Sequence, residues 1–180
     1  MENIKTKHLI GLQNISKQDI NTFIDVGFTF REILERPIKK VPVLKGKNIV
    51  NLFFENSTRT KISFELAEKR LSADITNFSS GSSSVKKGES LRDTIQNIHA
   101  MKMDCAVMRH PSPGSCLQLT QYVDAVVINA GDGTHEHPSQ ALLDMMSLQE
   151  KFNKIKGLKI AIVGDILHSR VALSNIYGLN

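Results

Sequence analysis

Hydroxyl side chains and one arginine closely follow a strongly apolar run in the first third of the chain. Residues 48–54 read NIVNLFF, and after two polar residues come Ser57, Thr58, Arg59 and Thr60. A helix beginning there would offer free N–H groups and a partial positive charge, which together bind anions. The hydroxyls and the guanidinium would add hydrogen bonds suited to a tetrahedral oxyanion. Because an ordinary serine N-cap beside a solvent-facing arginine is the alternative, phosphate binding here is a hypothesis.

A histidine and a glutamine flank a proline at the expected start of another helix. Pro138 is placed where proline opens a helix, with His137 before it and Gln140 on its first turn. The positive end of the helix dipole lowers the pKa of an imidazole there and favours a neutral ring that can polarise a carbonyl. Gln140 can accept a hydrogen bond from an NH2 group. A metal site at His135, His137 and Asp132 is the competing interpretation, although no third strong ligand has motif spacing.

Further candidate positions lie after two other apolar runs. Arg109 is at the carboxyl end of an expected strand, the edge where open α/β sheets bind ligands, although such arginines often form surface ion pairs instead. Arg170 follows Gly164 in the stretch GDILHSR. A dinucleotide-binding turn is excluded there, because the later glycines of G-x-G-x-x-G are missing. Residues 83–90 (SSVKKGES) are polar and, taken alone, are typical of a solvated loop.

Short β-rich runs alternate with segments of helical period, which predicts an α/β fold in which a parallel sheet is flanked by helices. Apolar runs predict strands at residues 48–54, 105–108, 125–128 and 158–163, and residues 74–78 are a further candidate strand. Helical periodicity and helix-start signals predict helices at residues 60–71, 89–101, 116–122 and 138–152, with another beginning at Ser169. The run LKIAIV at 158–163 reads as a buried parallel strand, which needs neighbours. Because only about one helix follows it, the chain is expected to be incomplete.

The composition is that of a globular chain. Hydrophobic residues make up 41% and charged residues 23%, and the net charge of +5 is scattered along the sequence. Aromatic residues make up 6% of the chain, and the basic residues form no stripe. Both features argue against nucleic-acid binding. Cys105 and Cys116 lack zinc-site spacing, which favours a reduced, cytoplasmic protein. The first 17 residues have no continuous apolar core, so neither a signal peptide nor a membrane span is expected.

Five motifs resemble those of the aspartate and ornithine carbamoyltransferases, in the same order. They are FFENSTRT, SSVKKGES, MRHP, HPSQALLD and VGDILHSRVA, between Phe53 and Ala172. Glu55 and the SSVKKGE loop favour the aspartate type over the ornithine type. The resemblance implies a carbamoyl-phosphate-binding domain at 1–137 and a bridging helix at 138–153. Residues 154–180 would then be the first strand and helix of a truncated, Rossmann-like aspartate-binding domain.

The resemblance also implies a role for each candidate residue. Carbamoyl phosphate would be bound by Ser57, Thr58, Arg59, Thr60, Arg109, His137, Gln140, Ser83 and Lys87. The catalytic groups would be Thr60, Arg109, His137 and Lys87. Gln140 would orient the carbamoyl nitrogen, and Lys87 and Arg170 would bind aspartate. Ser83 and Lys87 lie on a loop that reaches the site of a neighbouring subunit in the family.

By the same resemblance, the expected activity is transfer of the carbamoyl group of carbamoyl phosphate to the α-amino group of L-aspartate in pyrimidine biosynthesis. No metal or organic cofactor is implied. The expected assembly is a homotrimer with shared sites, and whether regulatory subunits attach is left open. An ornithine-type carbamoyltransferase and a non-catalytic carbamoyl-phosphate-binding protein are the alternatives.

Overall fold

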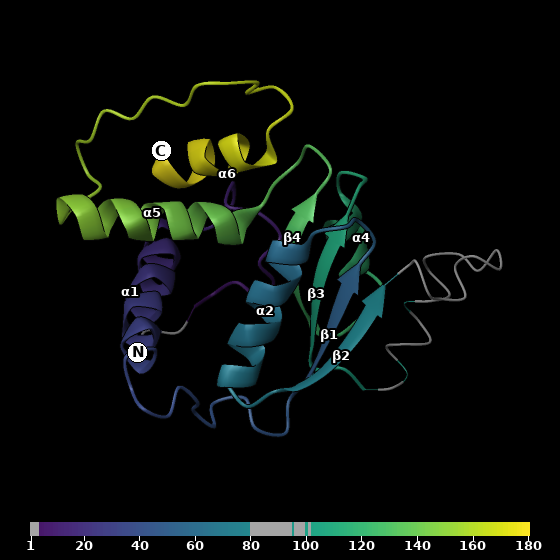
Figure 1. Ribbon diagram of the computed structural model, residues 1–180. Helices are drawn as coiled ribbons and strands as arrows, with labels where there is room; N and C mark the ends of the chain where they lie inside the picture. Colours follow the sequence, from purple (N-terminus) through teal and green to yellow (C-terminus); the bar gives the residue numbers. More distant parts are fainter. Residues whose placement is uncertain (1–3, 80–94, 96–99, 101) are drawn as a thin grey trace.

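The protein is built on a four-stranded parallel sheet (Figure 1). The computed structural model describes residues 4–79, 95, 100 and 102–180. The strands are β1 (Asn48–Phe53), β2 (Asp74–Ser79), β3 (Cys105–His110) and β4 (Val126–Asp132), in the spatial order β2-β1-β3-β4. Each lies where the sequence predicted a strand, so the parallel α/β sheet is confirmed.

The two central strands, β1 and β3, are buried on both faces, which explains why most of their residues are apolar. Alternate side chains of β1 enter different clusters: Val50 and Leu52 pack with Cys116 and Leu119, whereas Ile49 and Phe53 pack with other partners, among them Phe64. One face is therefore covered by α4 (Ser115–Leu119) and the other by α2 (Thr58–Arg70). Figure 1 shows α2 on the near side of the sheet and α4 on the far side.

A second group of helices lies beside the sheet. α5 (Pro138–Phe152) begins and ends where the sequence predicted. It packs against α1 (Lys17–Ile33), which the sequence analysis did not identify, through Ile20 and Ile24 of α1 and Ala141 and Met145 of α5. α6 (Arg170–Leu179) lies along the opposite side of α5 (Figure 1). None of the helices among the described residues is both long and apolar enough to span a bilayer.

The predicted strand at 158–163 is wrong for this chain. The segment is an irregular connection that arches over α6, and Val163 is 93% exposed (Figure 1). A parallel strand is stable only beside hydrogen-bonded neighbours, and no described strand lies next to it. The helix expected at Ser169 does form, with Ser169 as the N-cap that accepts from the backbone N–H of Ala172 at 3.2 Å.

Most of the helix predicted at 89–101 lies outside the described residues. Ile95 is described, and its side chain is buried in the same cluster as Leu52 and Met108. The loop at 83–90, with Ser83 and Lys87, is also outside the described residues. The domain boundaries at 137 and 153 remain predictions.

Candidate functional site

Glu55 joins two arginines at the carboxyl edge of the sheet. It follows β1, and Phe53 of that strand pairs with Arg109 of β3, so the register brings Glu55 beside Arg109. The Arg109 guanidinium donates to Glu55 Oε1 and, at 3.1 Å, to the carbonyl of Ala130. Arg170, the first residue of α6, donates to the two Glu55 oxygens at 3.1 and 2.9 Å. One carboxylate therefore bridges guanidinium groups from two distant parts of the chain, and the cluster keeps a net positive charge.

The charges of this cluster affect one another. Hydrogen bonds from Arg170 hold the pKa of the Glu55 carboxyl below its ordinary value, burial opposes this, and Arg109 adds to the lowering. Burial lowers the pKa of Arg109, and the neighbouring charge of Arg170 lowers it further. Arg109 is only 7% exposed, and its buried Nε has no hydrogen-bond partner in the described part of the chain. The pair of guanidiniums has donors and positive charge suited to an anion.

Gly131 leaves the space that the two guanidiniums occupy. Its backbone has a φ of 108°, a region that side chains with a Cβ rarely adopt. A Cβ at Gly131 would lie 3.0 Å from Arg109 Nη1 and 3.0 Å from Arg170 Nε. The glycine is therefore required both by the turn at the end of β4 and by the close approach of the arginines.

His137 lies buried beside the same charges. It occupies the N-cap position of α5, and its Nδ1 lies 3.3 Å from the hydroxyl of Ser139. Burial lowers the pKa of His137 to about 4, and the positive charges of Arg109 and Arg170 contribute to the lowering. The ring is consequently neutral at physiological pH, as the sequence predicted for an imidazole at a helix start.

A buried hydrogen-bond relay fixes the backbone of His137. Its N–H donates to Ser174 Oγ of α6 at 2.9 Å, and that hydroxyl donates to Glu136 Oε2 at 2.8 Å. The same Glu136 oxygen accepts from the backbone N–H of Leu12 at 2.7 Å. Glu136 is 1% exposed and Ser174 is 0% exposed. Three separate segments of the chain thus meet behind the imidazole.

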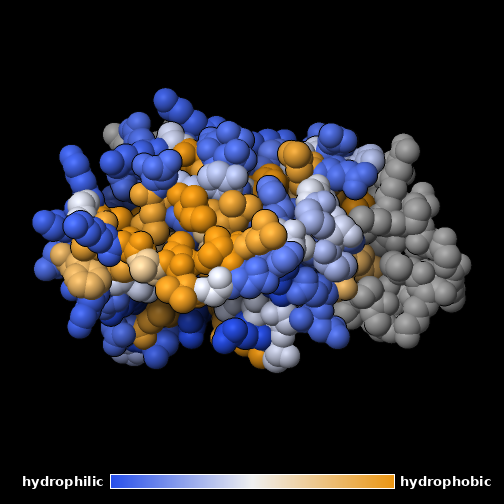
Figure 2. All heavy atoms as spheres, turned by 90° about the horizontal axis from the view of Figure 1, so that it is seen from above, coloured by the Kyte–Doolittle hydropathy of each residue, from blue (hydrophilic) through white to orange (hydrophobic). Residues whose placement is uncertain are grey.

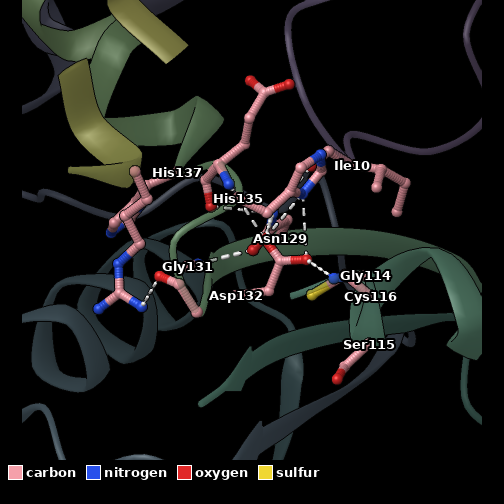
Figure 3. A network of polar contacts seen from close by, with 12 residues as sticks. Ile10, Gly114, Ser115, Cys116, Asn129, Gly131, Asp132, His135 and His137 are labelled. Atoms are coloured by element: carbon pink, nitrogen blue, oxygen red, sulfur yellow. Dashed lines mark hydrogen bonds and ion pairs between the residues drawn. The ribbon is translucent and has the colours of Figure 1, made fainter. Parts of the chain in front are cut away.

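Asn129 and Asp132 connect the loop after β3, which contains Gly114, to the loop that leads to His137 (Figure 3). Asp132 accepts from Asn129 Nδ2 at 2.7 Å and from the backbone N–H of Gly114 at 2.9 Å, and His135 Nδ1 lies 3.1 Å from it. Asn129 Oδ1 accepts from the N–H of Gly131 at 2.7 Å. His135 and Asp132 are therefore engaged in a fixed polar network. Within the described ranges, no group of three His, Cys, Asp or Glu side chains could hold a metal ion.

The predicted phosphate residues begin α2 at the same edge. Ser57 is its N-cap residue and makes no side-chain cap hydrogen bond. Thr58 and Arg59 are exposed, and Thr60 is half-buried. Arg59 forms no ion pair with another described residue, so it stands apart from the cluster around Glu55. Ser83 and Lys87 cannot be placed, because they lie outside the described residues.

A cleft opens beside the ion cluster, with a volume of about 800 Å³. Its lining includes Glu55, Pro111, Gly133, His168 and Arg170. From the sequence, Glu55 was only a mark of the aspartate type, and no role was predicted for Gly131, Glu136 or Ser174. The missing signal for Glu55 was its position: a carboxylate at the end of β1 faces the end of the neighbouring strand, where Arg109 was already a candidate.

Comparison with known proteins agrees with this arrangement. The family described as "Aspartate/ornithine carbamoyltransferase, carbamoyl-P binding domain" matches residues 7–150. The chain belongs to the aspartate/ornithine carbamoyltransferase family. Within it, the aspartate carbamoyltransferase catalytic subunit of Christiangramia forsetii is 59% identical over 176 residues. That of Flavobacterium johnsoniae is 57% identical over 179 residues.

The carbamoyltransferase relatives are longer than this chain. The alignments cover 98% and 99% of the chain but 57% and 58% of the two subunits, so the chain spans less than three fifths of their length. Among solved structures, aspartate transcarbamoylase from Trypanosoma cruzi in complex with carbamoyl phosphate and aspartate superposes with a TM-score of 0.91 at 32% identity. The superposition covers 98% of this chain and 58% of that one.

Proposed function

We propose that the protein carrying this chain transfers the carbamoyl group of carbamoyl phosphate to the α-amino group of L-aspartate. The products are N-carbamoyl-L-aspartate and phosphate, and the reaction belongs to pyrimidine biosynthesis. The observation that carries the proposal is the meeting of Arg109, Arg170 and neutral His137 at one sheet edge. The family, the names of the relatives and the ligands of the Trypanosoma cruzi structure support it.

The phosphate of carbamoyl phosphate binds at the start of α2. The free backbone N–H groups of the helix end face it, and the side chains that bind it are Ser57, Thr58, Arg59, Thr60 and Arg109. The absence of a side-chain cap bond at Ser57 supports this, because its hydroxyl is not committed to the helix. Arg109 Nε, buried without a partner in the described residues, is a further donor for the substrate.

Charge that develops on the carbonyl oxygen is stabilised by Thr60, Arg109 and His137. A neutral imidazole donates a hydrogen bond without competing for a proton, which suits a carbonyl that becomes an oxyanion. Gln140 accepts from the carbamoyl NH2 group. As the amine attacks, the new N–C bond forms and the C–O bond to phosphate breaks. Phosphate leaves with the bonding electrons and takes up the proton that the amine nitrogen loses. The protein mainly supplies positioning and electrostatic stabilisation.

Arg170 binds a carboxylate of aspartate. Its two hydrogen bonds to the Glu55 carboxylate support this role, since a guanidinium can bind a carboxylate through two parallel N–H donors. Lys87 with Ser83 completes the site from an adjacent subunit of a homotrimer in the cytoplasm, where Lys87 touches both substrates. The reaction needs no metal or organic cofactor, and regulatory subunits are compatible with it.

The test supplies carbamoyl phosphate with either L-aspartate or L-ornithine and measures the carbamoylated amino acid that forms from each. We expect product with aspartate and none with ornithine. Arg59→Ala and His137→Ala should each lower the rate about 100- to 1,000-fold. A protein that binds carbamoyl phosphate in calorimetry, yet yields no product at high aspartate, would be a binding protein and would overturn the proposal.

A further inference from the structure

Gln140 is held by a second connection between α5 and α6. Its Nε2 donates to Asp144 Oδ1 at 3.0 Å, one helical turn further along α5. The other oxygen of Asp144 accepts from Asn175 Nδ2 of α6 at 2.7 Å, and Asn175 also donates to the carbonyl of Val171 at 3.1 Å. Asp144 is therefore shared by two amide groups that come from different helices.

This arrangement fixes which end of the Gln140 amide points away from Asp144. An ionised carboxylate has only acceptors, so the amide nitrogen must face it. The amide oxygen, Gln140 Oε1, is then turned away, and it accepts no hydrogen bond from any described residue. Its free lone pairs can accept from an N–H donor but cannot bind a methyl group.

A pair of Gln and Asp four residues apart is common on isolated helices and contributes only about 0.2–0.5 kcal/mol. The contact between Asp144 and Asn175 of α6 distinguishes this pair from such isolated pairs. Asn175 is 8% exposed, and its amide contacts two acceptors, so it has a single satisfactory orientation. Asp144 is thus fixed from α6 and does not depend on the helix pair alone.

We propose that Asp144 is a specificity-determining positioning residue, which presents Gln140 Oε1 to the NH2 group of the acyl donor. The proposal rests on the proposed function and deepens it. The consequence is selection of carbamoyl phosphate over acetyl phosphate, which has the same size and charge but a methyl group in place of NH2. The discrimination comes from one hydrogen bond to the substrate, whose direction is set by a carboxylate that does not touch the substrate.

The experiment compares kcat/KM for carbamoyl phosphate and acetyl phosphate in the complete protein, with L-aspartate as acceptor. In Asp144→Asn, the new amide can donate to Gln140 Oε1, so the Gln140 amide can turn over. The preference for carbamoyl phosphate over acetyl phosphate should fall about tenfold, mostly because kcat/KM for carbamoyl phosphate decreases. Asp144→Glu, which keeps an acceptor-only group, should retain more of the preference than Asp144→Asn.

Asn175→Ala keeps Asp144 but removes the hydrogen bond that fixes its carboxylate from α6. The preference for carbamoyl phosphate should therefore fall less than in Asp144→Asn. This variant also tests the proposal if Asp144→Asn does not fold. Ser147→Ala is the matched control on the exposed side of α5, where the hydroxyl donates to the carbonyl of Leu143 and to no other described residue. If the variants lose activity equally with both acyl donors, Asp144 is merely structural and the inference fails. A wild-type protein without carbamoyl transfer would instead refute the proposed function.

Discussion

His137 donates its backbone N–H to the hydroxyl of Ser174, which lies 37 residues later on α6, at 2.9 Å. Arg170 is one helical turn before Ser174, so the same side of α6 carries the guanidinium that bonds Glu55. The positions of the imidazole and of the second arginine are therefore set by a single helix. A shift of α6 relative to α5 would displace both groups together.

Ser174→Ala should destabilise the protein by about 2 kcal/mol, because it leaves a buried N–H of His137 without an acceptor and removes a donor from Glu136. Urea unfolding would measure the loss, and amide hydrogen exchange at His137 should become faster. Ser147→Ala, which removes an exposed hydroxyl bonded within its own helix, should change neither quantity appreciably. Unchanged exchange at His137 in Ser174→Ala would contradict the relay.

Gly131→Ala should weaken binding of carbamoyl phosphate at least about tenfold, because the methyl group pushes Arg109 and Arg170 away from their places. Gly46→Ala is the matched control: Gly46 also has a positive φ, of 78°, but a Cβ there meets nothing within 4 Å. Both variants pay a backbone cost of about 1–2 kcal/mol. Isothermal calorimetry should show normal affinity for Gly46→Ala only, and equal affinities would refute the explanation.

The pH dependence of stability should carry the signature of His137. Its folded-state pKa of about 4 lies below the ordinary value of 6.5, so the unfolded chain takes up the proton first as the pH falls. Stability is therefore lost between these two values, by up to about 3 kcal/mol. Denaturant unfolding at several pH values should show a shallower decline in His137→Gln. An imidazole that titrates near 6.5 in NMR spectra would disprove this.

The pH dependence of stability that is expected from Glu68 is opposite to that from His137. Burial raises the pKa of its carboxyl, a hydrogen bond from Asn51 lowers it, and nearby Glu65 raises it. Because the folded state holds the proton more tightly, the stability contributed by Glu68 is complete below the ordinary pKa of 4.5 and is lost as the pH rises through the folded value. Glu68→Gln removes this loss and should stabilise the protein at neutral pH by about 1 kcal/mol.

The polar surroundings of Glu68 support that substitution. Glu68 Oε1 and Asn51 Oδ1 are both buried without a hydrogen-bond partner in the described residues. In Glu68→Gln an amide NH2 group would replace Glu68 Oε1 and could donate to Asn51 Oδ1. The measurement is the urea midpoint at pH 5 and pH 8. The difference in urea midpoint between Glu68→Gln and wild type should be larger at pH 8 than at pH 5. Glu32→Gln, on the exposed surface of α1, should show no such pH-dependent difference. A gap that narrows as the pH rises would contradict the assignment.

Much of the fold was predictable because a parallel sheet buried on both faces leaves a plain pattern. The runs that became β1 and β3 are mostly apolar, and Pro138 marked the start of α5. α1 was missed because its apolar residues are diluted by polar ones. Ile20 and Ile24 have helical spacing, and Ser16 accepts from the N–H of Asp19 as an N-cap, so the signal was present but weak.

The site was predictable in its residue types and less so in its contacts. Arg109, Arg170 and His137 were identified from motifs and do lie together. The contacts that hold them depend on residues far apart in sequence, such as Ser174 and Glu136, and no local pattern reveals a partner 37 or 38 positions away. Arg59 was expected with the other charges but lies exposed on α2 among the described residues.

The exposed run at 158–163 has a practical consequence for the isolated chain. It combines Ile160, Ile162 and Val163 with one charge, Lys159, and Figure 2 shows apolar side chains gathered on that face of the molecule. No backbone hydrogen bond from residues 159–163 reaches another described residue. A β-prone segment with unpaired amides is a template for pairing between copies. The isolated chain should therefore self-associate in concentrated solution, which light scattering would detect. Ile162→Lys should prevent this association.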